Sequence, residues 1–146
     1  EKLGINPELI FQKFLSENGF SKLPVVEGAR QFLQDLQGLG YWVQLLTARP
    51  KEKLVCLYDT YYWVDMLDIP CNAIDFSTEK FRWCAQSKYY DSGAIKFAID
   101  DSPKHALDYS KHGIKCYTPR KNYNKQVWNE PGVVIYNSFD EIIKDL

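Results

Sequence analysis

Residues 95–103 have the sequence Ile-Lys-Phe-Ala-Ile-Asp-Asp-Ser-Pro, in which a largely apolar run ends abruptly at two adjacent carboxylates. A run of this length, rich in bulky apolar residues and bounded by proline, predicts a buried strand over 95–99. In open α/β sheets, ligands bind in the crevice beyond the carboxyl ends of parallel strands. We therefore expect Asp100 and Asp101 to lie at such a crevice.

A second run of the same kind lies upstream. Residues 41–50 have the sequence Tyr-Trp-Val-Gln-Leu-Leu-Thr-Ala-Arg-Pro, which predicts a strand over 41–46 that ends at Thr47. The hydroxyl of Thr47 and the two carboxylates are thus predicted to project into one pocket.

Helical and extended patterns alternate around these two strands. Caps, glycine terminators and apolar residues at spacings of three and four predict helices over 7–17, 29–37, 51–63, 77–90, 103–112 and 139–146. Further strands are predicted over 71–76, 114–117 and 133–136, and a polar loop over 118–131. Strands separated by helices imply parallel pairing, hence a layered α/β/α domain.

Composition narrows the classes of function. The chain has 146 residues, a net charge of −1 and no basic block, which argues against a protein that binds a nucleic-acid duplex. Its apolar runs are too short for a membrane span, so no membrane partner is expected. The four cysteines lie far apart without a CxxC pair, which favours reduced thiols and a cytoplasmic location.

The order of the motifs is more specific than any single motif. A strand ending in Thr47, a lysine opening a later helix at Lys80, and a strand ending at Asp100 and Asp101 resemble the second, third and fourth motifs of the haloacid dehalogenase superfamily of phosphohydrolases. Residues 99–103, 112–114 and 122–124 are similar to the branch that contains the 5′(3′)-deoxyribonucleotidases. The resemblance implies a three-layer Rossmann-like core over residues 23–146 and leaves 1–22 as a cap or linker helix.

The resemblance also implies roles at a phosphate site. Thr47 would donate its hydroxyl, and Ala48 its backbone amide, to a phosphoryl oxygen, which stabilises charge in the transition state. Lys80 would place its ammonium against the phosphoryl group and the nucleophile. Lys88 and Lys96 remain alternatives to Lys80.

Asp100 and Asp101 would hold Mg²⁺, which prefers hard oxygen ligands. The family's first motif, a strand ending Asp-x-Asp, supplies the nucleophile and the general acid and base. No such strand precedes Thr47 in this sequence. In the family it lies between the strands that end at the equivalents of Thr47 and Asp100, so we expect the natural protein to begin further upstream and to include it.

Three functions remain open at this point. The first is a Mg²⁺-dependent phosphomonoester hydrolase that acts through an aspartyl-phosphate on a small phosphorylated substrate, with a nucleotide as one candidate. The second is a catalytically inactive relative that binds a phosphorylated ligand or a protein. The third is a sheet with an open slot that accepts a strand from a partner chain. The sequence does not indicate the oligomeric state.

Several residues have competing interpretations. Thr47 and the twin aspartates could simply start helices, although their place in the ordered set favours a site. Arg49 could reach a substrate phosphate or face solvent, and residues 122–124 could line the site. His105 and His112 lack a matching ligand and are not expected to bind metal. Four aromatic residues could stack a base, but their helical spacing favours core packing or a surface covered by a neighbouring segment: Tyr58, Tyr61, Tyr62 and Trp63.

Overall fold

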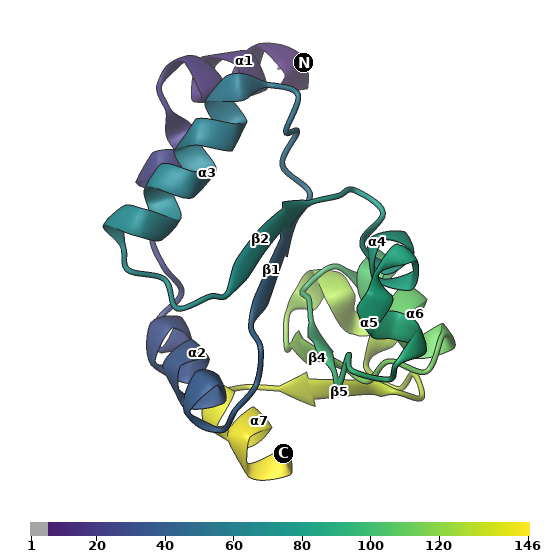
Figure 1. Cartoon of the computed structure of the whole chain (residues 1–146). Helices are drawn as coiled ribbons and strands as arrows, with labels where there is room; N and C mark the ends of the chain where they lie inside the picture. The colour runs from purple at the N-terminus through teal and green to yellow at the C-terminus, as the bar shows by residue number, and fades with distance from the viewer. Residues whose placement is uncertain (1–5) are drawn as a thin grey trace. The chain divides into compact units, whose positions relative to one another are not determined.

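The computed structural model describes residues 6–146. The chain divides between Thr78 and Glu79 into two compact units. Each unit combines helices with a small parallel sheet, so the protein is mixed α/β (Figure 1). The predicted core over 23–146 is therefore distributed over both units, and the first five residues of the predicted 1–22 segment lie outside the described residues.

The described part of the first unit contains α1 (Pro7–Ser16), the 3-10 helix η1 (Gly19–Lys22), α2 (Ala29–Gly38), β1 (Gln44–Thr47), α3 (Leu54–Met66) and β2 (Ala73–Phe76). Helix α1 begins as the sequence predicts, with Pro7 in its first turn and the Asn6 side chain accepting a 3.0 Å hydrogen bond from the backbone N–H of Glu8. Strands β1 and β2 are parallel, and Thr47 lies opposite Phe76.

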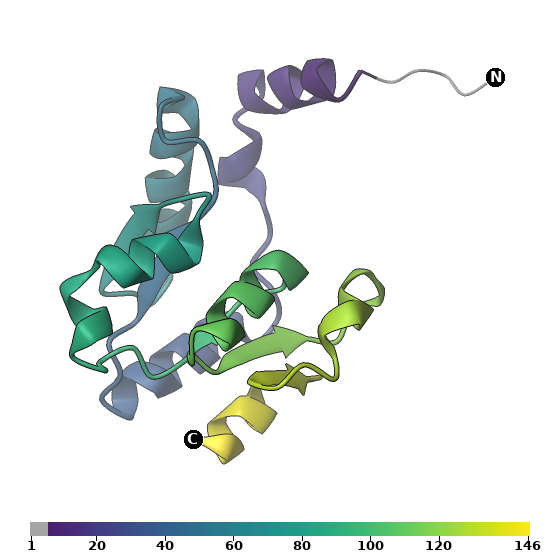
Figure 2. The same cartoon turned by 90° about the vertical axis from the view of Figure 1, so that its right-hand side faces the viewer.

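The second unit contains α4 (Lys80–Gln86), α5 (Lys88–Asp91), β3 (Ala98–Ile99), α6 (Pro103–Lys111), β4 (Cys116–Pro119), η2 (Asn122–Val127), β5 (Val133–Tyr136) and α7 (Phe139–Asp145). Its three strands are parallel in the order β3-β4-β5. Helix α6 contacts all three strands and so covers one face of this sheet, as Figure 2 shows.

Two predicted strands are shorter than expected. The strand predicted over 95–99 was wrong in extent, because β3 contains only Ala98 and Ile99 and both are half-buried at the end of the sheet. The central strand β4 is the buried one, since it has a strand on each side and α6 above it. Strand β1 starts at Gln44, three residues after the predicted start, and includes Thr47.

The helix predicted over 77–90 is two helices. Ser87 interrupts it with extended backbone angles, φ −79° and ψ 147°. Its hydroxyl donates a 2.7 Å hydrogen bond to the carbonyl of Cys84. Serine competes in this way for backbone groups that would otherwise continue a helix, which is why helical spacing alone did not reveal the break.

The strands that end at the two motifs are in different sheets. Strand β1 pairs with β2, and β3 pairs with β4, so β1 and β3 are not hydrogen-bonded neighbours. Within residues 6–146, each of these two strands has a strand partner on one edge and none on the other. The single three-layer sheet predicted from the resemblance stays a prediction.

Helix α3 corrects the expectation for the aromatic cluster. Tyr58, Tyr61 and Tyr62 are exposed, neither packed in a core nor covered by another segment. Trp63 is half-buried, and its Nε1 donates a 2.6 Å hydrogen bond to the carbonyl of Leu23. The helix instead buries Cys56, Asp59 and Thr60. Because α3 is apolar around most of its circumference, periodicity could not identify the face that packs inward.

Two observations relate to the predictions of reduced thiols and of no membrane partner. Cys56, Cys84 and Cys116 are buried, Cys71 is half-buried, and all are free thiols. No helix in residues 6–146 has both the length and the apolar composition that crossing a membrane requires. The compartment itself stays a prediction.

Candidate functional site

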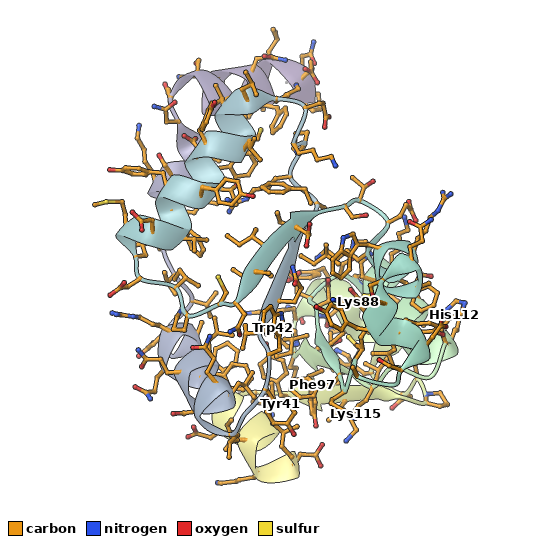
Figure 3. All side chains as sticks on the ribbon, in the orientation of Figure 1. Tyr41, Trp42, Lys88, Phe97, His112 and Lys115 are labelled. Carbon is orange, nitrogen blue, oxygen red and sulfur yellow. The ribbon has the colours of Figure 1, made fainter. Side chains whose placement is uncertain are left out.

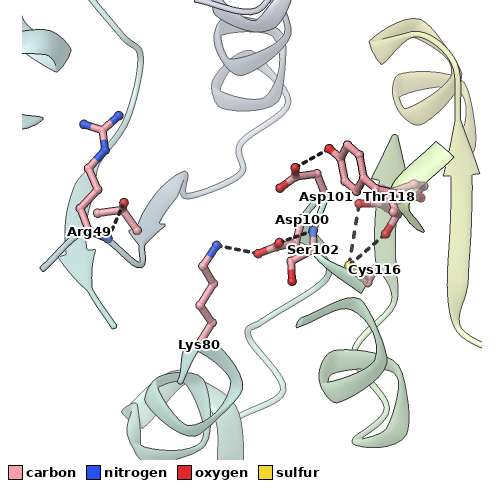
Figure 4. A network of polar contacts seen from close by, with 10 residues as sticks. Arg49, Lys80, Asp100, Asp101, Ser102, Cys116 and Thr118 are labelled. Atoms are coloured by element: carbon pink, nitrogen blue, oxygen red, sulfur yellow. Dashed lines mark hydrogen bonds and ion pairs between the residues drawn. The ribbon is translucent and has the colours of Figure 1, made fainter. Parts of the chain in front are cut away.

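A buried ion pair lies at the carboxyl end of β3. Lys80, the first residue of α4, places its Nζ 2.6 Å from Oδ2 of Asp100 (Figure 4). The side chains are only 16% and 4% exposed, respectively. The other oxygen of Asp100 accepts a 2.9 Å hydrogen bond from the backbone N–H of Ser102. Both carboxylate oxygens are thus held by donors, one of them charged.

Local structure explains why the Asp100 carboxylate is fixed here. The backbone N–H of Asp100 donates to the carbonyl of Tyr117 at 3.1 Å, which continues the pairing of β3 with β4. Ser102 then occupies the N-cap position of α6, whose first residue is Pro103, without a capping hydrogen bond from its side chain. Proline suits a first helical position, so the strand turns into the helix over only three residues, 100–102, and the side chain of Asp100 bridges that turn.

Asp101 has a different environment from its neighbour. It is exposed, and its Oδ2 accepts a 2.6 Å hydrogen bond from the phenol of Tyr123. Its backbone carbonyl accepts a 3.2 Å hydrogen bond from Nδ2 of Asn124. The hydrogen bond to Asp101 raises the pKa of Tyr123 to about 12, so the phenol remains protonated and able to donate at neutral pH.

The structure distinguishes among the three lysines left open by the sequence. Lys88 lies on α5 with its Nζ 5.2 Å from the ring centroid of Tyr89 (Figure 3). Lys96 donates a 3.0 Å hydrogen bond to the carbonyl of Gly93. Of the three, Lys80 is therefore the one that pairs with Asp100.

Thr47 and Ala48 belong to the first unit. Thr47 ends β1, and its Oγ1 accepts a 3.3 Å hydrogen bond from the backbone N–H of Arg49. Ala48, between them, is exposed. The hydroxyl of Thr47 thus shapes a tight turn after the strand and keeps its own hydrogen available to donate.

Arg49 is half-buried rather than simply facing solvent, and its contact with a substrate phosphate stays a prediction. Its Nη1 donates a 3.0 Å hydrogen bond to Thr60, and its guanidinium lies 4.4 Å from the ring centroid of Phe20. The side chain therefore turns into its own unit, where burial lowers the pKa of Arg49. The nearby Asp59, also buried, has an Oδ2 without a hydrogen-bond partner in the described structure. Apolar spacing gave no signal for these inward polar residues.

Sequence reasoning did not predict which side chains lie close to Asp100. Cys116 and Thr118 lie on β4, fully buried, with their side chains 3.8 Å apart (Figure 4). Burial raises the pKa of Cys116 to about 12, so it remains a neutral thiol. His105 on α6 is half-buried, and burial lowers its pKa. A histidine in the first turn of an ordinary helix carries no pattern that would have indicated this environment.

Comparison of the chain with protein-family models, with curated proteins and with solved structures returns no match. The family resemblance thus rests on the sequence motifs. In residues 6–146, no cluster of three or more His, Cys, Asp or Glu side chains has an arrangement suited to a metal ion. The functional argument therefore depends on the pair Asp100 and Asp101 and on the lysine beside it.

Proposed function

We propose that the protein is a Mg²⁺-dependent phosphomonoester hydrolase of the haloacid dehalogenase type, which acts on small phosphorylated substrates such as nucleotides. The observation that carries the proposal is the 2.6 Å pair of Lys80 with Asp100, next to Asp101 at the carboxyl end of a parallel strand. The lysine comes from another helix 20 positions earlier in the chain. This places a cation and two carboxylates where open α/β sheets bind ligands.

In the proposed reaction, the first aspartate of the family's Asp-x-Asp motif would attack phosphorus, and the ester P–O bond would break. The second aspartate of that motif gives a proton to the leaving oxygen, and water then hydrolyses the aspartyl-phosphate. Lys80 would stabilise the charge that develops on the phosphoryl oxygens, together with the hydroxyl of Thr47 and the amide of Ala48. The finer fold that goes with this proposal is the family's three-layer α/β/α core.

The donor set fits a magnesium ion. Mg²⁺ in proteins is commonly held by one or two carboxylates and keeps several waters, so a third protein ligand is not needed. Lys80 and Ser102 occupy one position on each oxygen of Asp100, and every carboxylate oxygen has a second lone pair. When bound, the ion would neutralise phosphoryl charge and orient the substrate.

One observation favours the alternative of an inactive relative that binds a phosphorylated ligand or a protein. The carboxylate of Asp100 is already balanced by the ammonium of Lys80. Without a nucleophile, the same groups could still bind a phosphate.

The test is hydrolysis of an aryl phosphate by the full-length product of the reading frame in the presence of Mg²⁺. We expect Asp101→Asn and Lys80→Met to lower kcat by about 100-fold or more, the loss typical of removing one fixed charge-stabilising group. Asp91→Asn changes an exposed carboxylate of the same unit and is the matched control. Phosphate binding without turnover would support the inactive alternative, and activity that survives in both variants would reject the proposed site.

A further inference from the structure

Tyr123 and Asn124 form a two-residue clamp on Asp101, and we propose that this clamp positions the Asp101 carboxylate for a divalent cation. Tyr123 is the positioning residue that sets the affinity for the cation, and Asn124 is its anchor. The inference rests on the proposed function, because it assigns a role to a residue outside the motifs that suggested that function.

Asn124 fixes the clamp to the sheet. It is fully buried, and its Nδ2 donates to the carbonyl of Pro119 at 2.8 Å as well as to that of Asp101. Its Oδ1 accepts from Nε1 of Trp128 at 2.9 Å and from the backbone N–H of Lys121 at 3.2 Å. All hydrogen-bonding positions of the amide are used, so the end of β4, the η2 turn and the Asp101 backbone are held together.

Tyr123 then controls the side chain of the same aspartate. Its phenol holds Oδ2 of Asp101 at 2.6 Å. The other oxygen, Oδ1, has no hydrogen-bond or ion-pair partner among residues 6–146. Asp100, in contrast, has donors on both oxygens. Among residues 6–146, Oδ1 of Asp101 is therefore the carboxylate oxygen of the twin-aspartate turn that has no donor, and the phenol fixes its direction.

A fixed carboxylate matters because Mg²⁺ demands nearly ideal octahedral geometry. An exposed aspartate without the phenol would rotate, and part of the binding free energy would be lost in ordering it. In other metal sites, removing the hydrogen-bond partner of a metal-binding carboxylate typically lowers the affinity for the metal by about 10- to 100-fold. Because Tyr123 is 56% exposed, its phenol can be removed with little effect on the core.

The experiment measures binding of Mn²⁺, as a spectroscopic probe for the divalent cation, to the full-length product by electron paramagnetic resonance. We expect Tyr123→Phe to weaken Mn²⁺ binding by about 10- to 100-fold with an unchanged thermal midpoint. Tyr89→Phe makes the same chemical change at an exposed residue of the same unit and should bind like the wild type. Asp101→Asn should lose most of the binding.

The outcomes separate this inference from the proposed function. If Tyr123→Phe binds Mn²⁺ as tightly as the wild type or more tightly, while Asp101→Asn has lost binding, the positioning role is wrong and the metal site stands. If the wild-type protein binds no Mn²⁺, both the positioning role and the metal-dependent function are overturned. A Tyr123→Phe variant that loses both affinity for Mn²⁺ and thermal stability would show that Tyr123 has a structural role instead.

Discussion

Asp100 is a buried carboxylate whose charge is balanced within its own unit. Lys80 and the backbone of Ser102 hold its two oxygens at 2.6 and 2.9 Å. An ionised carboxylate is costly to bury unless donors replace the lost water. The pair therefore serves stability and the proposed chemistry together, and the stability part can be tested without any substrate.

We predict that Lys80→Met lowers the free energy of unfolding by about 1 to 3 kcal/mol, because the buried Asp100 then loses its charged hydrogen-bond donor. Urea denaturation followed by circular dichroism measures the change. Lys104→Met is the matched control: it removes an exposed ion pair with Glu79 in the same unit, and surface pairs contribute only about 0 to 1 kcal/mol. Equal losses in the two variants would contradict the prediction.

At the scale of elements, the 3-10 helix η2 shows how buried hydrogen bonds give a polar loop a defined structure. The sequence predicts an irregular polar segment over 118–131, and the structure contains the turn Asn122–Val127 inside it. The turn is held by the buried amide of Asn124 and by Val127, which is also fully buried. These buried contacts matter because η2 contains Tyr123, whose phenol donates to Asp101.

We predict that Asn124→Ala lowers the free energy of unfolding by about 1 to 3 kcal/mol or more, since it leaves buried carbonyl and N–H groups without partners. Asn122→Ala, at an exposed position of the same turn, should stay within about 0.5 kcal/mol of the wild type. Thermal and urea unfolding of both variants make the comparison. Loss of the same size in Asn122→Ala would mean that the turn, rather than the Asn124 amide, provides the support.

At the scale of the whole molecule, the parallel strands are distributed over two sheets in two units. Each motif-bearing strand, β1 and β3, is an end strand of its sheet. A cation that binds the folded protein and not the unfolded chain raises the free energy of unfolding. Its binding can thus be detected without a catalytic assay.

We predict that Mg²⁺ at about 100 times its dissociation constant raises the free energy of unfolding by about 2.7 kcal/mol. Calorimetry with increasing Mg²⁺ measures the rise, and Asp101→Asn should abolish it. An equal rise in Asp101→Asn would place the bound ion elsewhere in the protein.

Local signals in the chain were sufficient for many elements. Asn6 and Pro7 start α1, and the apolar run at the end of the chain forms β5 followed by α7, because caps and short-range spacing act over a few residues. The sequence also predicted the placement of Thr47 and the twin aspartates at strand ends, which β1 confirms for Thr47 and β3 for Asp100.

Contacts between distant residues required the folded chain. Lys80 meets Asp100 across 20 positions, and Tyr123 meets Asp101 across 22, and no local pattern encodes either contact. Arg49 turns inward and donates to Thr60. The sequence did not predict this contact, because it depends on which elements pack around the side chain. Short-range propensity sets where helices and strands begin, whereas packing selects which polar groups become partners.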